Sequence, residues 1–113
     1  TRFWMPIETA VQLIMTAIKE GKGGEIFIPK APKKKMLQIL CELAHLNGSV
    51  EDGKKIKIIG LRPSEKTDEM LINEHEANRT LEFKDHYVIK SEFLPNNIRG
   101  GVKYKGGAYT SEI

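Results

Sequence analysis

Residues 2–29, RFWMPIETAVQLIMTAIKEGKGGEIFIP, change hydrophobic pattern twice and thereby decide the fold class. Their first four residues form a short apolar run that stops at Pro6 and is typical of a strand. From Ile7 to about Glu20 the apolar side chains recur at the spacing of a helix. Residues 25–30, EIFIPK, then show a second short strand pattern. A strand, a helix and a strand in succession predict an α/β fold.

The chain continues this alternation up to about residue 90. Its patterns predict a helix from Met36 to the Asn47-Gly48 pair, a strand at 55–59, a helical segment from 65 to about 79 with a break near Asn73, and strands at 80–83 and 86–89. The strands are few and short. We therefore expect the accessory end of an α/β protein and not a complete doubly wound sheet.

Residues 91–113 differ in composition from the preceding part of the chain, since they include two glycine pairs and a Pro-Asn-Asn run. Such a segment has little packing power, although Tyr104 and Tyr109 could anchor it. We therefore divide the chain into a folded domain, residues 1–90, and a Gly-rich C-terminal tail, residues 91–113.

Length and composition indicate one small globular domain, with 113 residues of which 40% are hydrophobic and 29% charged. The single cysteine, Cys41, excludes an internal disulfide and falls on an apolar helical face, so we expect a core residue in a reducing, cytoplasmic compartment. No stretch approaches the roughly 20 apolar residues of a membrane span. The chain opens at Thr1, without an initiator methionine, in what reads as the middle of a strand. We therefore expect a piece of a longer protein.

The motifs of several function classes are missing from the sequence. A net charge of +3 could favour nucleic acid, but the basic residues are not interleaved with aromatic side chains that would stack on bases. No Gly-x-x-Gly-x-x-Gly loop follows a strand, no Tyr-x-x-x-Lys pair occurs, and no Cys/His set has zinc spacing. We therefore expect no nucleic-acid partner, and no catalytic, cofactor-binding or metal-binding residue in this chain.

Arg62 and Glu65 flank a Pro-Ser pair directly after an apolar run, which leaves two interpretations open. They could be solvated charges of a turn, or a site where the arginine meets an anion and the glutamate meets a hydroxyl. Arg2, at the start of a predicted strand, is a second arginine of the same kind. Spacing alone favours the solvated turn.

The first predicted helix is apolar on most of its circumference, because Leu13, Met15 and Ala17 join its main stripe. A helix of that kind is buried on most sides. We therefore expect another domain or subunit to cover it, and we expect the isolated chain to be marginally stable or to self-associate.

Four blocks of the chain resemble, in the same order, the C-terminal part of bacterial nucleotide-sugar dehydratases. They are TRFWMPIETAVQLIMTAI (1–18), GGEIFIPKAP (23–32), IKIIGLRPSEKTDEMLINEHEANRT (56–80) and DHYVI (85–89). The chain is similar to the polysaccharide-biosynthesis branch of the extended short-chain dehydrogenase/reductases. Its nearest members are inverting UDP-N-acetylglucosamine 4,6-dehydratases, and UDP-N-acetylglucosamine 4-epimerases are close to them.

The resemblance implies a two-part enzyme that is usually a homo-oligomer. An N-terminal Rossmann half, absent from this chain, would hold NADP and the catalytic Tyr/Lys pair. The matching C-terminal part would bind the UDP-sugar. Arg2 maps onto an arginine that approaches the diphosphate, Arg62 and Glu65 map onto the phosphate-binding arginine and ribose-binding glutamate of an RPGE block, and Lys30 borders the ligand. Ser64 stands at the glycine of that block, and serine adopts a positive φ less easily.

With the resemblance, a UDP site becomes the preferred interpretation of Arg62 and Glu65. The leading hypothesis is a UDP-sugar-binding C-terminal portion of a 4,6-dehydratase that also epimerises C5, not catalytic alone. The alternatives are the same portion of a 4-epimerase, or a stand-alone ligand-binding module.

Overall fold

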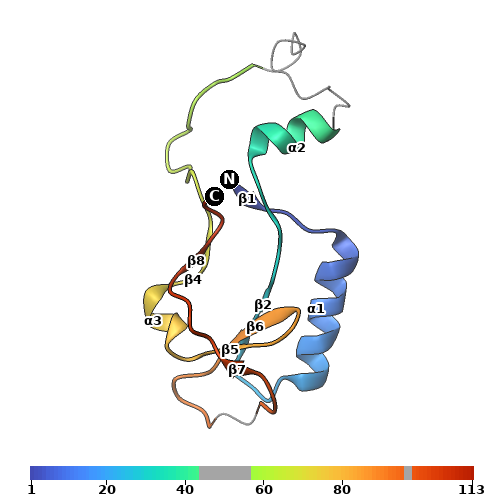
Figure 1. Ribbon diagram of the computed structural model, residues 1–113, viewed down its shortest axis with the longest axis vertical. Coiled ribbons are helices and arrows are strands. Elements are labelled where there is room, and N and C mark those ends of the chain that lie inside the picture. The colour runs from blue at the N-terminus through green and yellow to red at the C-terminus, as the bar shows by residue number, and fades with distance from the viewer. Residues whose placement is uncertain (44–56, 96–97) are drawn as a thin grey trace.

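The computed structural model of the chain describes residues 1–43, 57–95 and 98–113. In chain order its elements are β1 (Arg2–Phe3), α1 (Ile7–Glu20), β2 (Ile26–Pro29), β3 (Lys33–Lys34), α2 (Met36–Leu43), β4 (Met70–Ile72), α3 (Glu74–Ala77), β5 (Thr80–Glu82), β6 (His86–Ile89), β7 (Val102–Lys103) and β8 (Tyr109–Thr110) (Figure 1). The strands form a four-stranded sheet of order β2-β6-β5-β7 and two pairs, β1-β3 and β4-β8. Each pairing is antiparallel. The predicted mixed α/β class is confirmed.

The core lies on the four-stranded sheet and reaches the β4-β8 pair. Its buried members are Ile28 of β2, Ile89 of β6, Ile72 of β4 and Ala77 of α3, with tyrosines from β6, β8 and the loop between β7 and β8 packed against them. Ile72 and Ile89 are almost completely buried, and burial of such a side chain stabilises a fold by roughly 1.5–3 kcal/mol. Two antiparallel units, distant in sequence, are therefore joined by one hydrophobic cluster.

The helix predicted from 65 to about 79 is wrong except at Glu74–Ala77, and residues 65–72, directly before Asn73, where a break was predicted, are not helical. The Asn73 side chain accepts a hydrogen bond from the Glu76 backbone, and the Glu76 carboxylate accepts one from the Asn73 backbone. This capping box starts the helix at Glu74. The apolar residues just before it form β4, because there Ile72 reaches the core.

The strand predicted at 55–59 is wrong for residues 57–59, and 55–56 lie outside the described residues. The exposed segment at 57–60 has no neighbouring strand in the described part of the chain, and an extended segment cannot form a sheet without a partner. The second predicted helix is confirmed as α2 up to Leu43, and its predicted end at Asn47-Gly48 lies outside the described residues. Cys41 is buried, as predicted.

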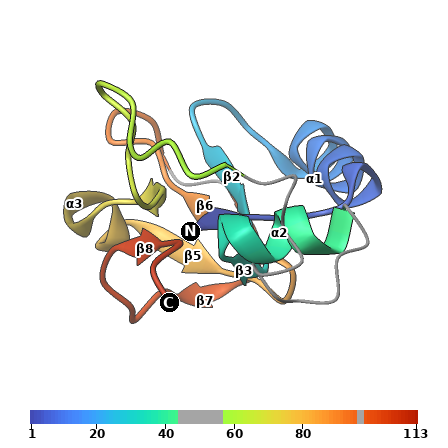
Figure 2. The ribbon, with the colours of Figure 1, turned by 90° about the horizontal axis from the view of Figure 1, so that it is seen from above.

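The expectation that residues 91–113 pack little is wrong. β7 extends the four-stranded sheet, and β8 pairs with β4. Tyr104 and Tyr109 pack against the core, as the sequence allowed, and Ser111 has no exposed surface. The two chain ends come close together in both ribbon views (Figures 1 and 2). Division of the chain at residue 90 stays a prediction.

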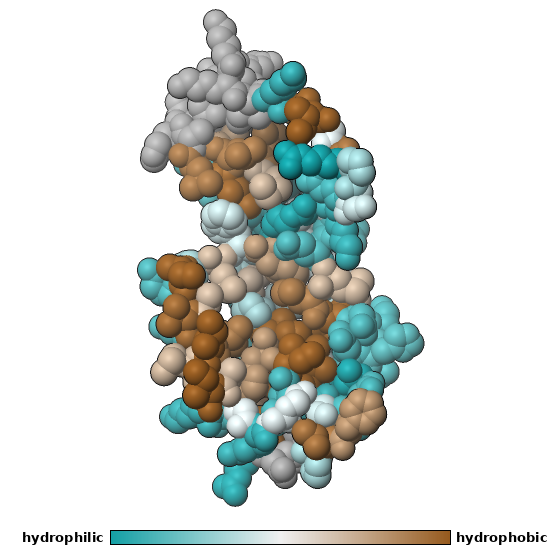
Figure 3. Space-filling view, turned by 180° about the vertical axis from the view of Figure 1, so that it is seen from behind, coloured by the Kyte–Doolittle hydropathy of each residue, from teal (hydrophilic) through white to brown (hydrophobic). Residues whose placement is uncertain are grey.

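α1 turns its most apolar side to solvent. It contacts β2 with one face and lies at the margin of the molecule (Figures 1 and 2). Its outer stripe is between 50% and 72% exposed and consists of Ile7, Val11, Ile14, Met15 and Ile18. Figure 3 shows a column of hydrophobic surface on the side where α1 lies. Trp4 is also exposed, whereas Phe3 packs against Tyr109.

The outer stripe of α1 predicts concentration-dependent self-association when residues 1–113 are produced alone. A lysine at Ile14 should reduce it, because a charge in an apolar contact must be desolvated. Gln12→Lys, on the same helix but facing the sheet, is the matched control. Sedimentation velocity over a concentration series measures the effect. A wild-type monomer with a sharp, concentration-independent unfolding transition would contradict the prediction.

Candidate functional site

Arg62, Pro63, Ser64 and Glu65 form a tight exposed turn. The Glu65 backbone N–H donates to the Arg62 carbonyl at 3.1 Å, and the Arg62 N–H donates to Glu65 Oε2 at 2.9 Å. Ser64 has φ of 66°, the only positive φ among the described non-glycine residues. Proline followed by a positive φ is the pattern of a type II turn, which favours glycine at its third position. The turn fixes the Glu65 carboxylate and leaves the Arg62 side chain exposed.

Arg2 lies next to the segment that follows this turn. Its guanidinium donates to the carbonyls of Thr67 and Lys66, each at 3.0 Å, and to that of Thr1 at 2.7 Å. Its Nε lies 3.8 Å from the Glu69 carboxylate, an ion pair that leaves the Arg2 side chain 25% exposed. Arg2 therefore fastens residues 66–69 to β1. The structure brings Arg2 close to the start of this segment, one residue after Glu65.

Lys30 lies elsewhere, at the end of β2. Its ammonium group donates to Glu82 Oε2 at 2.7 Å and lies 5.0 Å from the centre of the Tyr87 ring. Burial, and then the charge of Glu82, raise the pKa of Tyr87 to about 12, so the ring beside Lys30 is a neutral phenol. The Lys30 ammonium group, which was expected to border the ligand, is therefore already paired with Glu82.

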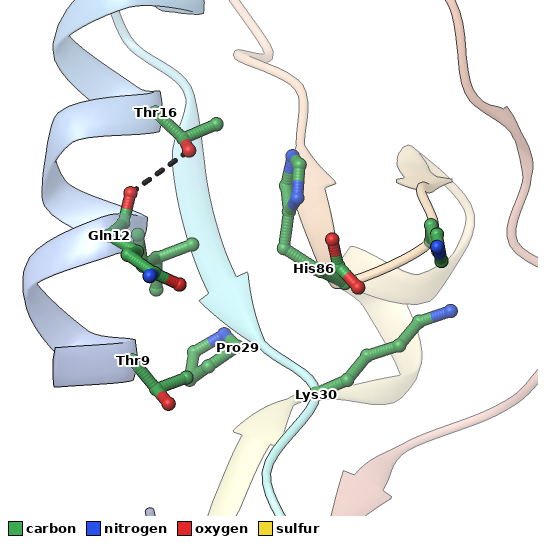
Figure 4. A pocket seen from close by; sticks show the side chains of 9 residues that line it. Thr9, Gln12, Thr16, Pro29, Lys30 and His86 are labelled. Carbon is green, nitrogen blue, oxygen red and sulfur yellow. Dashed lines mark hydrogen bonds between the residues drawn. The ribbon is translucent and has the colours of Figure 1, made fainter. Parts of the chain in front are cut away.

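A pocket of about 650 Å³ separates α1 from the β2-β6 edge of the sheet. Polar side chains of α1 line one wall, and the ends of β2 and β6 line the other; the labelled members in Figure 4 are Thr9, Gln12, Thr16, Pro29, Lys30 and His86. The Lys30 ammonium group points away from α1 (Figure 4). The sequence analysis did not predict this pocket. The polar residues Thr9, Gln12 and Thr16, which interrupt the apolar pattern of α1, could have indicated it.

His86, which lines this pocket, stacks on two aromatic rings. Its imidazole stacks on Phe83 at 4.7 Å and on Phe27 at 5.7 Å between ring centres. Burial lowers the pKa of His86 below its usual 6.5, Lys30 lowers it further, and Asp85 opposes both. The neutral imidazole is therefore favoured near neutral pH.

The described residues show no group of three or more His, Cys, Asp or Glu side chains that could hold a metal ion. No helix in the described part of the chain is long and apolar enough to cross a membrane. The available chemistry is that of anion and hydroxyl recognition at the 62–65 turn, where a guanidinium offers forked donors and a carboxylate offers acceptors.

Comparison with known proteins gives consistent matches. A sequence model described as "Polysaccharide biosynthesis protein" matches residues 1–91. A UDP-N-acetylglucosamine 4,6-dehydratase (inverting) from Campylobacter jejuni is 34% identical, over 99% of this chain and 35% of the relative. A UDP-glucose 4-epimerase from Rickettsia canadensis is 32% identical, over 79% of this chain and 25% of the relative.

A solved structure has the same fold. The X-ray structure of Pen from Bacillus thuringiensis matches with a TM-score of 0.77 and 31% identity, over 97% of this chain and 32% of Pen. The chain thus spans between 25% and 35% of the length of these three proteins.

Ser64→Gly should stabilise the 62–65 turn. A left-handed conformation destabilises a residue that carries a Cβ atom by about 1–2 kcal/mol. Glycine removes this strain, but it loses more conformational entropy on folding, which offsets part of the gain. We expect a gain of about 1 kcal/mol, seen as roughly fivefold slower exchange of the Glu65 amide hydrogen. Ser64→Ala keeps the Cβ atom that disfavours a positive φ and should show no gain. Equal exchange in both variants would contradict the assignment of strain to Ser64.

The lowered pKa of His86 predicts a loss of stability in mild acid. The unfolded chain binds a proton at His86 more readily than the folded chain, so the free energy of unfolding falls as the pH drops below about 6.5 toward the folded pKa. Urea unfolding at about pH 7.5 and about pH 5 measures this change. The free energy of unfolding should fall less between the two pH values for His86→Phe than for wild type. His75→Gln, at an exposed position, is the control. An unchanged pH dependence in His86→Phe would refute the prediction.

Proposed function

The chain belongs to the polysaccharide biosynthesis protein family, as its sequence blocks predicted, and from this premise we propose that it binds the UDP end of a nucleotide sugar. It would do so as part of a UDP-N-acetylglucosamine 4,6-dehydratase that also epimerises C5. The similarity to UDP-N-acetylglucosamine 4,6-dehydratases and to a UDP-glucose 4-epimerase supports a role in nucleotide-sugar chemistry. The observation that carries the site is the position of Arg2, whose guanidinium binds the backbone directly after the Arg62–Glu65 turn.

Arg62 supplies the first charge for the diphosphate. Its side chain is exposed, and its guanidinium can donate two parallel hydrogen bonds to phosphate oxygens. The Glu65 carboxylate is already oriented by the Arg62 N–H through Oε2. A carboxylate has acceptor capacity beyond one bond, so it can also accept hydrogen bonds from a ribose diol. The turn therefore offers a phosphate donor and a ribose acceptor three residues apart.

Arg2, whose guanidinium contacts residues 66, 67 and 69, would supply the second charge. Two arginines near a diphosphate offset the cost of removing its charges from water. Binding energy from this remote end of the substrate would position the sugar ring for chemistry elsewhere in the enzyme. The proposed contribution of this chain is binding and orientation.

Lys30 would contribute only after release from Glu82, with which it forms a close ion pair. Lys30 would then border the ligand, because the pocket beside it opens between α1 and the sheet. It belongs to a different element from the Arg2 and Arg62 region. A role for Lys30 would therefore require the β2-β6 end of the molecule to lie along the ligand.

NADP does not fit the residues that the structure describes. They pair only as antiparallel strands, whereas a dinucleotide site requires a parallel strand, a glycine-rich loop and a helix in sequence. We propose that NADP binds to a Rossmann half outside residues 1–113. The exposed stripe of α1 is the surface proposed to pack against that half. The homo-oligomer and the cytoplasmic location stay predictions.

A second candidate is a nucleotide-sugar 4-epimerase. The similarity to a UDP-glucose 4-epimerase favours it, since the same UDP-binding part could serve either reaction. The coding sequence upstream of Thr1 separates both enzymes from a stand-alone ligand-binding module. A Gly-x-x-Gly-x-x-Gly loop there would favour an enzyme.

UDP should bind to the full gene product that contains residues 1–113, and Arg62→Ala with Glu65→Ala should weaken binding by at least about tenfold, or 1.4 kcal/mol. The physical reason is the joint loss of a phosphate donor and a ribose acceptor. Isothermal titration calorimetry at low salt measures both affinities. Arg79→Ala with Glu92→Ala, which removes another surface arginine–glutamate pair, is the matched control. Equal UDP affinity of the two double variants would contradict the proposed site.

A further inference from the structure

Ser111 is fully buried although it stands two residues from the end of the chain. Its hydroxyl accepts a hydrogen bond from the Glu69 N–H at 2.8 Å and donates one to the Thr1 carbonyl at 3.2 Å. Its own backbone N–H donates to the Glu69 carbonyl at 2.8 Å. One short side chain therefore joins the C-terminal segment, residue 69 and the N-terminal residue.

Glu69 extends these contacts to β1. Its carboxylate accepts a hydrogen bond from the Phe3 N–H at 3.2 Å and forms the ion pair with Arg2. Arg2 in turn holds the carbonyls of Lys66 and Thr67. The backbone at residue 69 is thus fixed by Ser111, while its side chain and Arg2 fix β1 against the same segment.

The segment fixed in this way begins one residue after the Arg62–Glu65 turn. The turn has internal hydrogen bonds but is exposed, so its position relative to Arg2 depends on residues 66–69. On the proposed function, we infer that Ser111 is a positioning residue that sets the spacing between Arg2 and the Arg62–Glu65 turn for the two phosphates. The inference rests on the proposed function for the identity of the ligand, whereas the contacts of Ser111 do not depend on it.

The hydroxyl of Ser111 is the part that matters for this role. An alanine would fit the space but leave the Glu69 N–H without its buried acceptor, which is unfavourable, while the Thr1 carbonyl would keep only the hydrogen bond from Arg2. The 66–69 segment could recover hydrogen bonds with water by moving away from β1. That movement would separate Arg2 from Arg62.

The test compares Ser111→Ala with Thr80→Val in the full gene product. Thr80 is a matched control, because it is equally buried and its hydroxyl donates to the Glu76 carbonyl, away from the turn. Amide hydrogen exchange at Phe3, Glu65 and Glu69 reports the position of the segment. Titration with UDP and with uridine reports the spacing of the phosphate contacts, since uridine lacks the diphosphate.

We expect Ser111→Ala to exchange about tenfold faster at these three amides, and to bind UDP about tenfold more weakly with uridine affinity within about twofold of wild type. Thr80→Val should leave both readouts unchanged even where it lowers the melting temperature. Unchanged exchange in Ser111→Ala, or an equal loss of UDP and uridine affinity, would overturn the inference.

If Ser111→Ala does not fold, a second variant still tests the inference. Glu69→Ala removes the carboxylate link to Phe3 and Arg2 at a half-exposed position, and it should show the same selective loss. Unaltered UDP affinity in Glu69→Ala would overturn the inference. If wild type binds no UDP while Ser111→Ala still exchanges faster at the turn, the proposed ligand fails and the positioning role of Ser111 stands.

Discussion

The hydrogen bonds around Glu69 join parts of the chain that lie up to 110 positions apart, and the candidate site depends on them. Ser111 fixes the Glu69 backbone, and the Glu69 carboxylate reaches β1. The Arg62–Glu65 turn is exposed and carries few contacts of its own. Loops commonly bear binding residues on a rigid scaffold, and here the scaffold is the meeting point of the two chain ends.

The hydrophobic core holds this meeting point in place. β4 begins directly after Glu69, and β8 ends directly before Ser111, so their pairing brings the two residues together. Ile72 of β4 then enters the cluster formed with the four-stranded sheet. The outer stripe of α1 differs from this core, because its apolar side chains are exposed and nothing in the described part of the chain covers them. The meeting point of the two termini is thus held by polar contacts, whereas the outer stripe of α1 is free to pack against another surface.

Local patterns predicted what depends on local sequence. The periodicity of residues 7–20 gave α1, and the short runs before Pro29 and at 86–89 gave β2 and β6. The β4-β8 pair and the burial of Ser111 escaped prediction, because they join segments about forty residues apart, with weak patterns. For the site, the sequence and the family resemblance predicted the candidate residues. Their geometry depends on side chain–backbone hydrogen bonds of Arg2, which no residue pattern reports, whereas the positive φ of Ser64 agrees with the glycine that the family has at that position.

The proposed function requires that Arg2 and the Arg62–Glu65 turn face one diphosphate and its ribose. A crystal structure of the full gene product with UDP would decide this. We expect phosphate oxygens within hydrogen-bond distance of both guanidinium groups and a ribose hydroxyl within hydrogen-bond distance of the Glu65 carboxylate. UDP bound in the pocket beside His86, or Arg62 directed into solvent with UDP bound elsewhere, would contradict it.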